Sequence, residues 1–272
     1  MNSPSPELSA MIDAAQAAGH GLLRRFSQLS DLVIRAKSGP ADLVSVADEE
    51  AEQTARTILS RFRPDYAFLG EEGGQVSGRD ASHSWIVDPL DGTTNFLFSC
   101  PLWGVNVALA RDGEVVAGVT YIPVMEEMFV AEKGRGAWLN GRRIHVSSRA
   151  TLGDAVLSCG MPFAGKPDHP VFAREMALLS ADVAGLRRTG ACAVDMAYVA
   201  CGRWDAYWER ALNAWDMAPG LILASEAGGT VSNVRGDRLD LHGQNVCISN
   251  GRIHAALVDR LNQALNGPPN EG

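Results

Sequence analysis

Two aspartates three positions apart, Asp88 and Asp91, are the residues whose types and spacing point most directly to chemistry. They follow an apolar run, residues 85–87, that is typical of the end of a buried strand. Hard cations such as Mg²⁺ bind one or two carboxylates together with the phosphate oxygens of a substrate. A helix starting just beyond them would offer unpaired N–H groups to that phosphate, and Gly92 would let it approach the backbone. The segment predicts a metal and phosphate site, and the alternative is a surface turn.

Three further acidic positions could contribute to such a site. Glu71 follows an apolar strand and precedes two glycines, where the alternative is a solvated acidic turn. Asp216 stands ahead of an apolar helical run, so we expect it to cap that helix, a role compatible with metal binding. Glu209 ends an aromatic strand, and could be a surface residue or a contact for substrate hydroxyls.

Two other motifs are weaker than they look. Residues 160–167 fit part of a P-loop, but no Ser or Thr follows Lys166, and Pro162 lacks an N–H that could hold phosphate. The sequence from Asp91 to Thr93 is similar to the aspartyl-phosphate motif of haloacid-dehalogenase-type phosphatases, which spaces its aspartates two apart rather than three. We read neither motif as a functional site.

The composition is that of an ordinary soluble globular protein. The 272 residues are 46% apolar and carry a net charge of −8 without a basic run, so we expect no nucleic-acid partner. No window is apolar enough to predict a membrane span and the start of the chain does not look like a signal peptide, so the expected location is cytoplasmic. Five scattered cysteines predict neither disulfides nor a zinc site.

The predicted elements change character along the chain. Helical spacing predicts helices over residues 6–28 and 48–62, and alternation predicts antiparallel strands between 103 and 139. Strands and helices alternate after residue 147. A boundary near 147–154 divides the chain into an N-terminal lobe, 1–148, and a C-terminal lobe, 149–272, within one compact unit.

Taken together, these segments resemble the inositol monophosphatase family of lithium-sensitive, Mg²⁺-dependent phosphomonoesterases. Residues 85–96 are similar to the first signature of the family, and residues 215–220 with 225–229 to the second. Residues 37–48, 70–72 and 134–141 match in the same order. The resemblance implies an α/β (α+β) fold, a layered αβαβα sandwich like that of inositol monophosphatase and fructose-1,6-bisphosphatase.

The resemblance also implies a role for each site residue. Two or three Mg²⁺ ions would be held by Glu71, Asp88, the carbonyl of Leu90, Asp91 and Asp216. The phosphate would lie on the N–H groups of Gly92 and Thr93, and the catalytic residues would be Thr93, Asp48, Glu71 and Asp91, with Thr93 and Asp48 activating the water. Substrate contacts would come from Asp91, Gly190, Ala191, Cys192, Glu209 and Asp216, with Lys37 near the phosphate or metal.

The expected reaction is hydrolysis of a small-molecule phosphate monoester, inositol 1-phosphate, by metal-activated water, in a homodimer. The alternatives within the superfamily are histidinol phosphate, fructose-1,6-bisphosphate and phosphoadenosine phosphate. A bisphosphate would need a second basic pocket, for which Arg187 and Arg188 are the only candidates. An alternative of another class is a regulatory protein-binding role with a secondary phosphatase activity.

Overall fold

The computed structural model describes residues 4–29, 34–39 and 42–267, with only the backbone described before Ser45 in the second and third of these ranges. The helices are α1 (Pro6–Phe26), α2 (Val46–Phe62), α3 (Thr93–Leu97), α4 (His169–Asp182), α5 (Cys192–Ala200), α6 (Ala214–Glu226) and α7 (His254–Leu265). The strands are β1 (Ile34–Gly39), β2 (Asp42–Ser45), β3 (Tyr66–Gly70), β4 (Gly74–Val76), β5 (Asp80–Asp91), β6 (Gly104–Arg111), β7 (Glu114–Ile122), β8 (Glu127–Glu132), β9 (Gly136–Leu139), β10 (Arg142–Ile144), β11 (Val156–Cys159), β12 (Gly185–Arg187), β13 (Ala206–Arg210), β14 (Thr230–Ser232) and β15 (Asn245–Ser249).

Two large sheets organise most of these elements, while β1 and β2 pair with each other in a separate two-stranded sheet. The larger has eight strands in the order β10-β9-β8-β7-β6-β5-β3-β4, and the smaller has five in the order β12-β11-β13-β15-β14. In the larger sheet β3 and β5 run parallel, which brings the carboxyl ends of both strands to the same edge. Ligands in α/β proteins gather at such strand ends.

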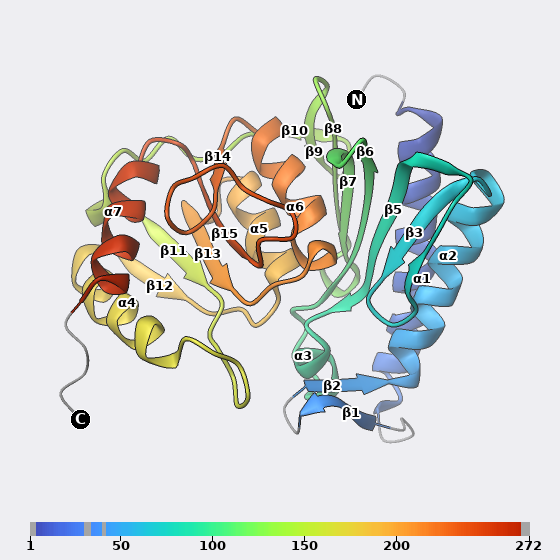
Figure 1. Ribbon diagram of the computed structural model, residues 1–272, viewed down its shortest axis with the longest axis horizontal. Coiled ribbons are helices and arrows are strands. Elements are labelled where there is room, and N and C mark those ends of the chain that lie inside the picture. The colour runs from blue at the N-terminus through green and yellow to red at the C-terminus, as the bar shows by residue number, and fades with distance from the viewer. Residues whose placement is uncertain (1–3, 30–33, 40–41, 268–272) are drawn as a thin grey trace.

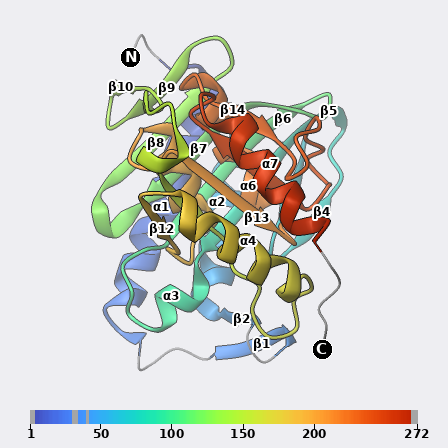
Figure 2. The same cartoon turned by 90° about the vertical axis from the view of Figure 1, so that its left-hand side faces the viewer.

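Helices and sheets alternate in five layers (Figure 1). Helices α1 and α2 cover the outer face of the larger sheet, α5 and α6 fill the space between the two sheets, and α4 and α7 cover the outer face of the smaller one. Figure 2 shows α4 and α7 side by side on that outer face. The predicted αβαβα sandwich is confirmed.

The inner helices are apolar around most of their surface because both sheets bury them. Eight of the nine residues of α5 are buried, and so are nine residues of α6, among them Pro219. All strands of the larger sheet precede residue 147 and all strands of the smaller one follow it, while α6 contacts both. The division into lobes 1–148 and 149–272 stays a prediction.

Most predicted helices and strands are present within a few residues of their expected ends, and one local expectation, that Asp216 is the N-cap of α6, was wrong. The helix expected just beyond Asp91 is the short α3, in which Phe96 is buried, and Phe98 beyond its end is 76% exposed. Asp216 does not cap α6 from the position before the helix. The cap is Asn213, whose N–H donates to Asp216 Oδ2 over 2.6 Å, so that Asp216 lies within the first turn.

Candidate active site

Three carboxylates from two distant parts of the chain meet between the sheets. Asp88 and Asp91 lie at the end of β5 and Asp216 in the first turn of α6, and one oxygen of each lies within 4.8 Å of the others. Asp88 is buried, whereas Asp91 and Asp216 keep part of their surface accessible. Oxygen atoms grouped at such distances suit a hard divalent cation.

A bulge at the end of β5 explains how aspartates three residues apart reach one site. Residues three apart on a regular strand point to opposite faces. Here Asp88 pairs with Asn106 but Asp91 pairs with Gly104, so one extra residue is accommodated on β5. Pro89 lies in this bulge, where a strand tolerates the loss of an N–H.

Local hydrogen bonds fix the carboxylates of Asp88 and Asp91 and the backbone of Asp216. Leu90 N–H donates to Asp88 Oδ1 over 3.0 Å, and Ala193 N–H at the start of α5 donates to Asp91 Oδ2 over 2.6 Å. The side-chain amide of Asn106 on β6 donates to the carbonyl of Asp216 over 3.3 Å. Two elements besides β5 and α6, namely α5 and β6, thus hold the cluster together.

The electrostatics of the cluster favour a bound cation. Burial, with the negative charges of Glu71, Asp91 and Asp216, raises the pKa of Asp88 well above its usual range. Burial raises the pKa of Asp91 to about 8, and the charges of Glu209 and Glu71 add to this in spite of the hydrogen bond from Ala193. Burial and the charge of Glu71 also raise the pKa of Asp216. Only protons or a cation can offset this repulsion, so the donor set fits a divalent metal ion.

Glu71 lies beside this cluster, in the turn after β3. Its N–H donates to the carbonyl of Val87 on the neighbouring strand over 3.3 Å, and the residue lines the same pocket as Asp91 and Asp216. Because β3 and β5 are parallel neighbours, the turn after one strand meets the end of the other. The structure therefore places Glu71 beside the aspartates, as the sequence predicted.

The start of α3 follows Asp91 directly. Gly92 has φ 88°, a left-handed conformation that favours glycine, and α3 begins at Thr93. The Thr93 hydroxyl lies 3.1 Å from Asp48 Oδ1 and 3.0 Å from the carbonyl of Leu90. Asp48 is itself oriented in the first turn of α2, where its Oδ2 accepts from the backbone N–H of Ser45 at 2.9 Å.

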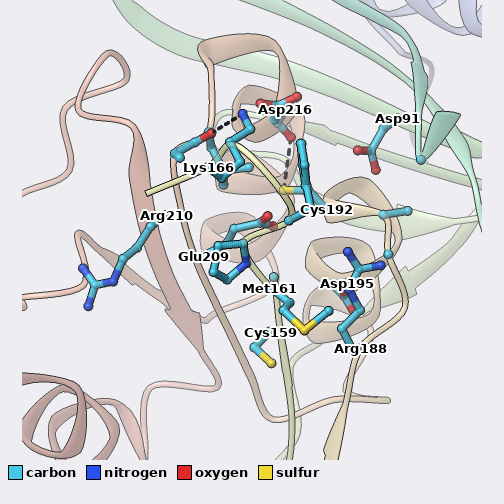
Figure 3. A pocket seen from close by; sticks show the side chains of 18 of the residues that line it. Asp91, Cys159, Met161, Lys166, Arg188, Cys192, Asp195, Glu209, Arg210 and Asp216 are labelled. Atoms are coloured by element: carbon cyan, nitrogen blue, oxygen red, sulfur yellow. Dashed lines mark hydrogen bonds between the residues drawn. The ribbon is translucent and has the colours of Figure 1, made fainter. Parts of the chain in front are cut away.

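A pocket of about 450 Å³ extends from the cluster toward the smaller sheet (Figure 3). Its metal-side wall contains Glu71, Asp91 and Asp216, and the predicted substrate contacts Gly190, Ala191 and Cys192 lie next to that wall. The remaining predicted contact, Glu209, lines the far wall. Burial raises the pKa of Glu209 to about 7, although the Tyr207 hydroxyl donates to it. A carboxylate on the far wall is placed to accept hydrogen bonds from a hydroxylated ligand.

Two cations lie on either side of Glu209 in the pocket wall. Figure 3 shows the Glu209 side chain between those of Lys166 and Arg188, and both cations lower the pKa of Glu209. Lys166 comes from the loop that only resembled a P-loop, three residues before α4 begins at His169. Arg187 does not line the pocket and lies over the Trp204 ring. Of the two arginines considered for a second basic pocket, only Arg188 therefore lines the site.

Sequence reasoning missed the residues that support the far wall. Asp195 on α5 lines the pocket, and burial raises its pKa to about 7 although the Thr189 hydroxyl donates to it over 2.6 Å. Asn95 donates to the carbonyls of Thr189 and Leu102, which ties the segment before α5 to the end of α3. The signals in the sequence for these residues were an Asp within an otherwise apolar helix and the Asn that follows Thr93 and Thr94, which could cap a helix or touch a ligand.

One predicted residue lies outside the described side chains. Lys37 is on β1, for which only the backbone is described, so its expected place near the phosphate stays a prediction.

Comparison with known proteins agrees with this geometry. The family model of the inositol monophosphatase family matches residues 3–266. The chain is 47% identical to an inositol-1-monophosphatase of Caulobacter vibrioides over 93% of its own length and 100% of that protein. It is 39% identical to the Nus factor SuhB of Pseudomonas aeruginosa, over 97% and 98% of the two chains. A solved structure, the extragenic suppressor protein suhB from Bartonella henselae, superposes with a TM-score of 0.91 at 42% identity, covering 94% and 98% of the two chains.

The fold and the acidic pocket define a metal-dependent phosphatase of the layered αβαβα type. The chain belongs to the inositol monophosphatase family and is a phosphoric monoester hydrolase. Among the described residues, no helix is long and apolar enough to cross a membrane.

Proposed function

We propose that this protein hydrolyses inositol 1-phosphate with Mg²⁺ bound to the acidic cluster. Asp88, Asp91 and Asp216 with the Leu90 carbonyl and Glu71 would hold two to three ions. The observation that supports this assignment most strongly is the approach of three carboxylate oxygens within 4.8 Å of one another beside a pocket that Glu209 also lines. Bound Mg²⁺ would neutralise charge on the phosphoryl oxygens and lower the pKa of the attacking water.

The start of α3 would bind the phosphate group. The N–H groups of Gly92 and Thr93 belong to the first turn of α3, which leaves them without a partner inside the helix. A Cβ on Gly92 would lie 3.0 Å from the Ala191 Cβ, so the glycine also lets the 190–192 segment pack closely against the proposed phosphate site. Direct contact between phosphate and backbone N–H groups would then fix the scissile bond beside the carboxylates.

Thr93 and Asp48 would orient the attacking water. The Thr93 hydroxyl has one proton and two acceptors within reach, Asp48 and the Leu90 carbonyl. When that proton is directed to Asp48, the Thr93 oxygen is left as an acceptor for a proton of the water. The Ser45 N–H holds Asp48 in the orientation in which it can accept the proton of the Thr93 hydroxyl.

Glu209 and the 190–192 segment would recognise the inositol ring. An ionised Glu209 accepts hydrogen bonds from ring hydroxyls, and Asp91 and Asp216 would contact the hydroxyls nearer the phosphate. Hydroxyl recognition by a buried carboxylate discriminates strongly against substrates that lack the hydroxyl, because the carboxylate is then left unpaired.

The test is phosphate release from a panel of monoesters with and without Mg²⁺. The panel contains inositol 1-phosphate, histidinol phosphate, fructose-1,6-bisphosphate and phosphoadenosine phosphate. We expect Mg²⁺-dependent release with the highest kcat/KM for inositol 1-phosphate. A higher value for any other member would move the assignment to that substrate.

The family resemblance supports three further parts of this proposal. The protein would act as a homodimer in the cytoplasm and would be inhibited by Li⁺ at the metal site. Sedimentation of the purified protein and a Li⁺ titration of its activity test the assembly and the inhibition.

The name Nus factor SuhB of a relative favours a second candidate, a regulatory role exerted through protein binding. Such a role would survive loss of the metal site. An Asp91→Asn variant used as bait would then capture the same partner as the unmodified protein, whereas a purely enzymatic protein would capture none.

A further inference from the structure

Glu52 is a buried carboxylate outside the proposed chemistry. It lies on α2 and is 5% exposed. Its Oε2 accepts from the N–H of Glu72 over 2.8 Å, and its Oε1 accepts from the N–H of Gly73 over 2.7 Å. Both N–H groups belong to the turn after β3, directly beyond Glu71. One side chain of α2 therefore holds the turn that carries a proposed metal ligand.

The glycines of this turn make room for that contact. A Cβ on Gly73 would lie 2.6 Å from Glu52 Oε1, and a Cβ on Gly70 would collide with Glu52 Oε2. Neither glycine has a positive φ, so the backbone conformation itself does not require glycine at these positions. The close approach of the Glu52 carboxylate gives a physical reason for glycines on both sides of Glu71 and Glu72.

The turn is held from both directions. Before the contact with Glu52, the N–H of Glu71 donates to the carbonyl of Val87 on β5, the residue next to Asp88. After it, the next two N–H groups donate to one carboxylate, and hydrogen bonds to an ionised acceptor are stronger and shorter than neutral ones. Glu71 is thus fixed between β5 and α2.

The same face of α2 serves the other half of the site. Asp48 and Glu52 are four residues apart, so they lie on one side of the helix. Asp48 contacts Thr93 at the start of α3, while Glu52 contacts the turn after β3. Helix α2 therefore sets the distance between the proposed water-orienting pair and Glu71.

We infer that Glu52 is a positioning residue, which holds the 70–73 turn so that Glu71 reaches the metal. This inference rests on the proposed function, in which Glu71 is a metal ligand. Groups that orient metal ligands from behind commonly change metal affinity by about 10–100-fold when they are replaced. A merely structural role for Glu52 would instead lower stability and leave metal affinity unchanged.

The test is Mn²⁺ binding to the whole protein, followed by the electron paramagnetic resonance signal of the free ion. In Glu52→Gln one acceptor oxygen remains, but the amide NH₂ faces the second backbone N–H. We expect the Mn²⁺ dissociation constant to rise about 10-fold, while KM for inositol 1-phosphate at saturating Mg²⁺ changes less than about 2-fold because Glu52 touches no substrate. Glu50→Gln is the matched control, since Glu50 is exposed on the same helix and pairs with Arg25.

A second variant disturbs the same contact from the other side. Gly73→Ala keeps the Glu52 side chain, but the added Cβ would push the Glu52 carboxylate away from the turn. We expect weaker Mn²⁺ binding here too, and an effect of the double variant smaller than the sum of the two single effects because both act on one contact. Folded Glu52→Gln and Gly73→Ala proteins that bind Mn²⁺ as the unmodified protein does would overturn the inference.

Glu71→Gln separates this inference from the proposed function. Loss of Mn²⁺ affinity in Glu71→Gln without any loss in Glu52→Gln would refute only the positioning role. Unchanged affinity in Glu71→Gln would refute the metal role of Glu71, and the inference about Glu52 with it.

Discussion

The Thr93 hydroxyl lies 3.1 Å from Asp48 Oδ1, which joins the start of α3 to the first turn of α2 across 45 positions of sequence. Asp48 also takes part in the capping box of α2 through Oδ2, which accepts from the backbone N–H of Ser45, while its Oδ1 accepts from Thr93. Thr93 lies one residue beyond Gly92, whose N–H is proposed to bind the phosphate. Its place next to the acidic cluster is the basis for assigning it to water activation.

Replacement of Thr93 by Ala tests that assignment. The variant keeps the backbone N–H proposed for phosphate binding but removes the oxygen that would accept a proton from water. We expect kcat to fall about 10²–10⁴-fold, the usual contribution of a positioned proton acceptor, while KM changes little. The measurement is steady-state hydrolysis at saturating Mg²⁺, and Thr94→Ala is the neighbouring control. An unchanged kcat would exclude the role.

Replacement of Asp91 by Asn tests the metal assignment. Metal stabilisation of the transition state contributes several kcal/mol, and about 1.4 kcal/mol is tenfold in rate, so we expect a loss of about 10³-fold or more. The Asn oxygen can still accept from Ala193, and one repelling charge is removed from the cluster. Thermal unfolding in EDTA should therefore show a Tm equal to or above that of the unmodified protein. A large fall in Tm would assign Asp91 a structural role instead.

The metal-free protein should lose stability as the pH rises. Burial raises the pKa of Asp91 to about 8 in the folded state, whereas an unfolded aspartate titrates near its model value of 3.8. Between these values the folded state binds more protons than the unfolded one, so stability falls with increasing pH. Below pH 3.8 both states are protonated and this group contributes no further change.

Added Mg²⁺ should offset that loss because it replaces the protons. The stabilisation by Mg²⁺, measured as the difference in Tm with and without the ion, should be larger at pH 8 than at pH 6. The Asp91→Asn variant should show a smaller pH dependence in EDTA. A Mg²⁺ effect that shrinks as the pH rises would contradict the account.

Recognition of the inositol ring should depend on pH through Glu209. Burial raises its pKa to about 7, so the acceptor form becomes dominant as the pH rises through neutrality. The ratio of kcat/KM for inositol 1-phosphate to that for phenyl phosphate, which has no ring hydroxyls, should rise over this range. In Glu209→Gln the ratio should be low and independent of pH. A parallel rise in the variant would assign the effect to another group.

Local chemistry was the part of the site that the sequence predicted well. Asp88 and Asp91 could be grouped because they are close in sequence, and Glu71 because an acidic residue after a strand is typical of ligand sites. The bulge that turns both aspartates toward one site was not predictable, since it exists only in the pairing of β5 with β6.

Contacts between distant segments were the part that the sequence could not predict. The N–H of Ala193 donates to Asp91 across 102 positions. Every residue except proline has a backbone N–H, so the residue type does not reveal this donor. Asp216 was expected to be the residue before its helix, but Asn213 already supplies that cap, so Asp216 occupies the first turn. The position of Asp216 depends on how α6 packs between the two sheets, which no local pattern encodes.

The most direct test of the central claim is the location of bound metal. Crystals grown with Mn²⁺ in place of Mg²⁺ would be measured at the manganese absorption edge. The account predicts anomalous density between the carboxylates of Asp88, Asp91 and Asp216, and its loss in Asp91→Asn crystals grown under the same conditions. Ordered carboxylates without anomalous density among them would contradict the assignment of this cluster as the metal centre of the phosphatase.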